Sequence, residues 1–151
     1  MTRILATALL ITAGSVFAQD AATIIELKPS TNIATPLAYD KTEFTAKAGA
    51  KIKLVMNNNG GAAPQPHNVV LCKPGTMDKV VGAAMGMLTD PNGMAKAYVP
   101  ESPDIIAFTK FAQPGGTESV EVTLPAEAGD YQFFCTFPGH AAIMKGILKV
   151  E

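Results

Sequence analysis

The regular alternation of polar and apolar residues constrains the fold of this chain more than any other feature. It occurs in segments 51–56, 119–124 and 147–151. In the last of these, Leu148 and Val150 fall on one side and their neighbours on the other. Successive side chains of a β-strand point to opposite faces, so these segments predict half-buried strands that share a core.

Short segments rich in glycine, proline and asparagine separate the expected strands. They lie at residues 47–49, 57–61, 73–75, 114–116 and 128–130. Many short strands divided by such turns are typical of an all-β sandwich. Tyr131 follows the last turn and is expected to form a tyrosine corner, which is a structural role.

Three further segments complete the prediction of a single domain. Residues 23–28 and 43–47 are weaker strand candidates. Residues 77–98 are rich in alanine, glycine and methionine and do not alternate, which predicts a short helix or an irregular flap outside the sandwich. The sequence contains no visible repeat or linker, so residues 19–151 are expected to form one domain.

The first 18 residues have the pattern of an export signal peptide. Arg3 gives a charged start, an uncharged apolar run follows at 4–17, and Val-Phe-Ala at 16–18 fits cleavage by signal peptidase. The alternative is an uncleaved membrane anchor, which would need roughly 20 apolar residues to span a bilayer. We therefore expect a mature periplasmic protein, residues 19–151, that does not span the membrane.

The net charge of the chain argues against one class of partner. The chain has 12 Lys and Arg residues against 13 Asp and Glu residues, and removal of the signal peptide would also remove Arg3. The mature protein would be weakly acidic, whereas proteins that bind nucleic acid present a basic surface. Nucleic acid is therefore not an expected partner.

Residues 135–144 carry the strongest chemical signal in the sequence. They read Cys-Thr-Phe-Pro-Gly-His-Ala-Ala-Ile-Met, which brings a thiolate, an imidazole and a thioether within ten residues. Two His and one Cys with a distant axial Met form the blue-copper ligand set. His67 is the only other histidine in the chain. We therefore predict one copper ion, cycling between cuprous and cupric, with His67, Cys135, His140 and Met144 as ligands.

Each predicted ligand also has a purely structural interpretation. Cys135 and Cys72 could form a disulfide, because an export compartment is oxidising. The two histidines could be satisfied structural residues, and Met144 could simply fill the core. Cys72 lies five residues after His67, so on a regular strand the two side chains point to opposite faces. It is expected to be a free thiol, with an intermolecular bridge as the alternative.

Four methionines fall in the expected flap. They are Met77, Met85, Met87 and Met94. Thioethers can bind a second, cuprous ion, but methionines more often pack a flap against a core, and packing is the preferred interpretation.

Three segments resemble one protein family. Residues 131–146 look like the C-terminal copper loop of azurins, and residues 66–71 resemble the upstream histidine motif of azurins and plastocyanins. Residues 106–110 also resemble azurin. The resemblance covers about residues 39–151 and identifies the chain as an azurin-like cupredoxin, although it has Pro66 before the first histidine and lacks a second pair of cysteines.

The resemblance implies a Greek-key β-sandwich of the cupredoxin type and further roles around the metal. Asn68 and Thr136 would brace the two ligand segments against each other. The backbone N–H groups of Asn68 and Phe137 would point at the Cys135 sulfur. His140 would present its outer edge at the surface, where redox partners dock.

These residues predict an electron carrier that works as a monomer. Its partners would be redox proteins, such as cytochromes or a copper or haem reductase, docking near His140. The predicted apolar patch for docking comprises Ala62, Ala63, Pro64, Phe137, Pro138 and Ala141. One alternative is a periplasmic protein that binds and delivers copper. Another is an enzyme with Cys135 as nucleophile and His140 as base, although no orienting group or oxyanion hole is evident.

Overall fold

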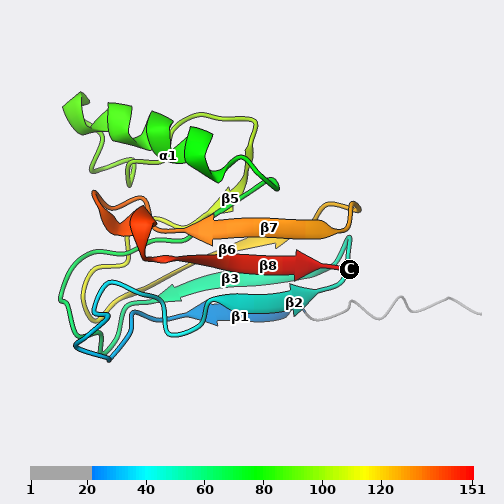
Figure 1. Cartoon of the computed structure of the whole chain (residues 1–151), viewed down its shortest axis with the longest axis horizontal. Coiled ribbons are helices and arrows are strands. Elements are labelled where there is room, and N and C mark those ends of the chain that lie inside the picture. Colours follow the sequence, from blue (N-terminus) through cyan, green and yellow to red (C-terminus); the bar gives the residue numbers. More distant parts are fainter. Residues whose placement is uncertain (1–21) are drawn as a thin grey trace, which may run out of the picture.

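A computed structural model describes residues 22–151, so the expected signal peptide lies outside the described residues. Within residues 22–151, eight strands and one α-helix follow one another. Figure 1 shows their arrangement. The strands are β1 (Thr23–Leu27), β2 (Glu43–Ala46), β3 (Lys51–Asn57), β4 (Val70–Cys72), β5 (Ile105–Phe108), β6 (Thr117–Thr123), β7 (Gly129–Phe134) and β8 (Lys145–Val150). The helix is α1 (Met77–Gly86), and the short 3-10 helices are η1 (Met87–Thr89) and η2 (His140–Ala142).

The strands form two mixed sheets. One sheet has the order β1-β3-β6 and the other the order β2-β8-β7-β4-β5. In each sheet one pair is parallel, β1 with β3 and β2 with β8, and the other pairs are antiparallel. The predicted β-sandwich with one short helix is confirmed. No helix within residues 22–151 is long and apolar enough to cross a membrane.

The core between the sheets follows the alternation in the sequence. On β3, Ile52, Leu54 and Met56 are at most 1 % exposed. On β8, Leu148 and Val150 are buried, as predicted. The apolar sides of the strands therefore meet in one cluster, which is the expected outcome when each sheet has one buried face.

A second buried layer lies on the outer face of the five-stranded sheet. Val70, Cys72 and Phe134 point away from the main core and pack in a separate cluster with residues of the flap, including Val80 and Ala97. Figure 1 shows α1 lying along this side of the molecule, next to β5 and β7. Because β4 is buried on both faces, its sequence is continuously apolar instead of alternating.

The structure tests two predictions, the packing of the flap methionines and the free thiol of Cys72. Met77 packs in the outer cluster, as expected, but Met85 is 51 % exposed and Met94 is 44 % exposed. The expectation of packing is therefore wrong for these two side chains. Cys72 and Cys135 are both free thiols, and the Cys72 thiol donates to the Gln132 carbonyl over 3.4 Å.

The turn before β7 is closed by a side chain. The hydroxyl of Tyr131 donates to the carbonyl oxygen of Glu127 over 2.9 Å. This is the bond of a tyrosine corner, so that prediction is confirmed. The corner lies at the opposite end of β7 from Cys135, which directly follows Phe134.

Candidate metal centre

Three of the predicted ligands converge at one end of the sandwich. The donor atoms of His67, Cys135 and His140 lie within 4.8 Å of one another, and all three residues are buried. His67 precedes β4, Cys135 follows β7, and His140 begins η2. In Figure 1 this is the end where β7 stops and β8 begins.

Two backbone hydrogen bonds hold His67 in place. Its N–H donates to the Ala112 carbonyl over 3.1 Å, and the Ala112 N–H donates back to the His67 carbonyl over 2.8 Å. Neither ring nitrogen has a hydrogen-bond partner, although the side chain is completely buried. Burial, reinforced by the neighbouring His140, lowers the pKa of His67 to about 4. Buried polar atoms without a partner in the protein are rare, and a role as ligands is one explanation for them.

The loop after β7 curls back on itself. The Cys135 N–H donates to the Met144 carbonyl over 3.0 Å, and the Met144 N–H donates to the His140 carbonyl over 2.7 Å. Gly139 has a φ of 81°, a left-handed conformation that suits glycine at this turn. These bonds place Met144, which is fully buried, beside the same core as Cys135.

The sulfur of Cys135 lies in an apolar pocket with two backbone donors. Burial raises the pKa of this thiol to about 12 in the absence of metal, and the N–H groups of Asn68 and Phe137 oppose that shift. Nδ1 of His140 is 3.7 Å from the sulfur. The structure therefore places both N–H groups where the resemblance implied them. Such donors tune a metal–thiolate bond when a metal is present.

Asn68 and Thr136 join the two ligand segments. Nδ2 of Asn68 donates to Oγ1 of Thr136 over 2.7 Å, and the Thr136 N–H donates to Oδ1 of Asn68 over 2.9 Å. Both residues are buried. This reciprocal pair fixes the segment of His67 relative to the segment of Cys135, in the arrangement that the family resemblance implied.

Comparison with known proteins identifies the family. The sequence profile described as "Copper binding proteins, plastocyanin/azurin family" matches residues 25–151. The chain belongs to the plastocyanin/azurin family.

Relatives and solved structures agree with this assignment. Auracyanin-A of Chloroflexus aurantiacus is 40 % identical over 117 residues, which cover 76 % of this chain and 68 % of the relative. Azurin-1 of Alcaligenes xylosoxydans xylosoxydans is 35 % identical over 119 residues, covering 76 % of this chain and 89 % of the relative. The structure of auracyanin A superposes with a TM-score of 0.72 and 34 % identity, over 87 % of this chain and 100 % of that chain.

The donor set of this plastocyanin/azurin family member fits copper. A buried thiol and two buried imidazoles within 4.8 Å supply the soft and borderline donors that copper prefers. Neither ring nitrogen of His67 has a hydrogen-bond partner in the protein, so either is available to bind a metal. Within residues 22–151 no carboxylate belongs to the cluster, so ions that require oxygen ligands, such as calcium or magnesium, do not fit it.

Two further contacts of this cupredoxin were not predicted from the sequence. The hydroxyl of Tyr39 donates to the Asn68 carbonyl over 2.6 Å. The carbonyl of Ala97, at the end of the flap, accepts from Oγ1 of Thr136 over 2.7 Å and from Nδ2 of Asn68 over 3.4 Å. A backbone carbonyl has no side-chain signature, so the sequence offered no signal for Ala97.

The predicted exposure of His140 is wrong. The residue is only 2 % exposed, and its Nε2 lies 2.6 Å from Oε1 of Gln65. The amide of Gln65 therefore covers the edge that was expected to face solvent. Of the predicted apolar patch, Ala62 and Pro64 are exposed. Ile143, which the prediction omitted, is 55 % exposed.

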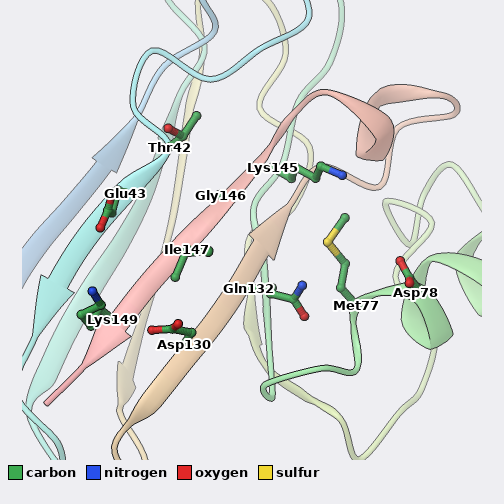
Figure 2. A pocket seen from close by; sticks show the side chains of 10 residues that line it. All are labelled: Thr42, Glu43, Met77, Asp78, Asp130, Gln132, Lys145, Gly146, Ile147 and Lys149. Carbon is green, nitrogen blue, oxygen red and sulfur yellow. The ribbon is translucent and has the colours of Figure 1, made fainter.

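One surface hollow lies away from these ligands. It has a volume of about 630 Å³ and lies across β2, β8 and β7 near the start of α1 (Figure 2). Charged side chains of both signs line it, among them Glu43, Asp130, Lys145 and Lys149. None of the four predicted ligands lines this hollow. All four are buried, so the candidate metal centre of this family member is a closed cluster.

Proposed function

We propose that this protein is a single-electron carrier that binds one copper ion through His67, Cys135, His140 and Met144. The observation that carries the proposal is the buried cluster of three donors in which His67 has two ring nitrogens without partners. When bound, copper would supply one-electron exchange between its cupric and cuprous states.

The protein's own contribution would be to hold the donors still. His67 is fixed by the paired backbone bonds to Ala112, and the 135–144 loop by its internal bonds. The Asn68–Thr136 pair locks these two supports together. Donors that cannot move adapt little to a change of charge, so little structural reorganisation accompanies electron transfer.

The same burial disfavours the two alternative functions. A delivery protein needs adjustable, accessible donors, whereas His67, Cys135, His140 and Met144 are at most 2 % exposed. A catalytic cysteine must reach substrate as a thiolate, yet Cys135 is fully buried and burial raises its pKa to about 12. We therefore propose that the chain is not an enzyme.

Descriptions of solved relatives support the carrier role. Auracyanin A is described as a "blue" copper protein. An auracyanin of Roseiflexus castenholzii, 37 % identical to this chain with a TM-score of 0.70, is described in a dithionite-reduced form. The reduced form of this relative is consistent with a metal site that accepts electrons.

The partners would be redox proteins that dock as this protein diffuses. The exposed residues Ala62, Pro64 and Ile143 lie on segments that flank the Gln65–His140 contact and would provide apolar docking area. A cytochrome or a copper or haem reductase would fit this role, and we propose a monomer. Nucleic acid is not a partner in this proposal, because the chain is weakly acidic.

We also propose that residues 1–18 direct export and that residues 19–151 are the mature periplasmic protein. The support is the pattern of a charged start, an apolar run and a small-residue cleavage site. The mass of the protein recovered from the periplasm tests this directly. A mass equal to that of the full chain, starting at Met1, would contradict the proposed cleavage.

A visible absorption spectrum of residues 19–151 titrated with cupric ion tests the metal site. We expect an intense thiolate-to-copper band that saturates at about one equivalent, because one thiolate serves one ion. Cys135→Ser should abolish the band, and Cys72→Ser, the matched control, should retain it. A band that is absent in the unaltered protein, or that depends on Cys72, would contradict the proposed site.

A further inference from the structure

Gln65 makes a side-chain contact with a predicted ligand that the family resemblance did not suggest. Its Oε1 lies 2.6 Å from Nε2 of His140, and Gln65 itself is half-buried. It lies on the segment between β3 and β4, two residues before His67, whereas His140 lies 75 residues later in η2. The contact therefore joins two parts of the centre. One is the strand side, formed by residues 65–68 before β4, and the other is the loop side, formed by residues 135–144 after β7.

The chemistry of this contact selects one form of the imidazole. The amide oxygen of Gln65 can only accept, so His140 donates through Nε2–H. A neutral imidazole carries one proton, which leaves a lone pair on Nδ1. Nδ1 is the nitrogen that lies 3.7 Å from the Cys135 sulfur, so the lone pair is turned toward the other donors. A metal binds only an unprotonated nitrogen, so the Nδ1–H form of the ring could not bind it through Nδ1.

The backbone of Gln65 is fixed by a buried asparagine. Asn58 is 3 % exposed, and its Nδ2 donates to the carbonyl oxygens of Gln65 and Ala112, each over 2.8 Å. Ala112 is also the residue whose backbone pairs with His67. One side chain therefore sets the position of Gln65 relative to His67, and the amide reaches His140 from a rigid base.

We propose that Gln65 is a positioning residue for His140: its side-chain oxygen holds the Nε2–H form of the ring, aims Nδ1 at the metal position, and covers the ring edge through which electrons would leave. This inference rests on the proposed function for the identity of the metal. It does not rest on it for the form of the ring, which is a property of the metal-free protein.

The position of Gln65 over the His140 ring also affects docking. His140 is 2 % exposed, so a partner that approaches this end of the molecule meets the Gln65 amide before the imidazole. The route for an electron would then include the hydrogen bond from Nε2–H to the amide oxygen. The side chain at position 65 would thus influence both the ligand and the contact surface.

The form of the ring in the metal-free mature protein is the decisive measurement. Nitrogen NMR of histidine-labelled protein at about pH 8, where histidine is neutral, distinguishes Nε2–H from Nδ1–H. We expect the Nε2–H form to dominate at His140. Gln65→Leu should shift the ratio of the two forms by about fivefold or more, because it removes the acceptor and excludes water.

Two further variants separate positioning from general damage. Gln65→Glu keeps an oxygen acceptor and should preserve the Nε2–H form. Gln113→Leu, a matched change of an exposed glutamine, should behave like the unaltered protein. With copper, Gln65→Leu should weaken cupric affinity by about 10- to 100-fold, measured by chelator competition, because outer hydrogen-bond partners of ligating histidines have effects of this size.

The outcomes distinguish this inference from the proposed function. If Gln65→Leu retains both the Nε2–H ratio and the cupric affinity of the unaltered protein, the positioning role is wrong. If the unaltered protein gives no blue band but the ring form still depends on Gln65, the positioning role stands and the carrier proposal fails. A blue band together with a Gln65-dependent ring form supports both.

Discussion

The two histidines of the candidate centre are held in different ways. His67 is placed by backbone bonds to Ala112, and its ring has no hydrogen-bond partner. His140 is placed by bonds within its own loop, and its ring touches both Gln65 and Cys135. The strand side is therefore fixed by the fold itself, whereas the loop side depends on a few local contacts.

Substitutions on the two sides should therefore affect different properties of the protein. A change on the strand side must disturb the sandwich, because His67 belongs to a network that includes buried Asn68 and Asn58. A change on the loop side can alter the surroundings of the ligand while the sheets remain intact. The predictions below are ordered from the largest expected effect to the smallest.

Removal of the pair that joins the two sides should have the largest effect. Asn68→Leu deletes the bonds to Thr136 and Ala97 and leaves buried groups without partners. We expect the free energy of unfolding to fall by about 3 kcal/mol, since each unsatisfied buried group costs roughly 1–3 kcal/mol. Urea denaturation of the metal-free protein measures this.

A matched variant shows whether that effect belongs to the junction. Asn59→Leu makes the same chemical change at an exposed position and should alter the unfolding free energy by less than about 0.5 kcal/mol. Equal losses in the two variants would show that Asn68 does not join the strand side to the loop side.

Acid should destabilise the metal-free protein through the strand-side histidine. The pKa of His67 is lowered to about 4 in the folded state, below the usual value of about 6.5 in an unfolded chain. The unfolded state therefore binds more protons between these values, and stability is lost as the pH falls through this window. From pH 7 to pH 5 we expect a loss of about 2 kcal/mol from His67.

The composition of the chain makes this pH prediction specific. The chain has only two histidines, and burial also lowers the pKa of His140, so its contribution has the same sign. His67→Gln should flatten the dependence and leave the part due to His140, with a smaller part near pH 5 from carboxylates whose pKa is lowered in the folded state, such as Glu26 and Asp104. Urea midpoints for this variant that follow those of the unaltered protein between pH 7 and pH 5 would exclude His67 as the source.

The turn in the ligand loop should give the smallest effect. Gly139 has a φ of 81° but open space around it, so Gly139→Ala tests backbone conformation alone. We expect a loss of about 1 kcal/mol. Gly82→Ala, in the middle of α1 with nothing within 4 Å, should instead gain about 0.5–1 kcal/mol. Thermal unfolding of both variants tests this contrast, and a loss at Gly82 equal to that at Gly139 would argue against the turn.

Sequence reasoning predicted features that repeat along the chain or form a compact motif. The period of two located β3 and β8, and the spacing within residues 135–144 pointed to three of the donors. The contact between Gln65 and His140 was not predictable, because it joins segments 75 residues apart and depends on one rotamer. The bonds to the Ala97 carbonyl were hidden for a similar reason, since any residue supplies a carbonyl.

The flap shows a different limit. Its composition suggested apolar packing, but the helix has only one face against the sheet, so Met77 is buried and Met85 is exposed. A helix places successive residues about 100° apart, and the sequence did not reveal which side would meet β4 and β7. The orientation of α1 is set by the outer cluster, in which one face of the helix packs on the five-stranded sheet.

The position of β8 between β2 and β7 has a consequence for how the chain reaches its native state. Glu43 pairs with Ile147, about 100 residues later, so the five-stranded sheet cannot close until almost all of the described chain is present. Contacts of such large sequence separation slow folding, because a long loop must close before they form. A chain built in this way should fold only after nearly all of it has been synthesised, and the cluster of His67, Cys135 and His140 should form only at that late stage.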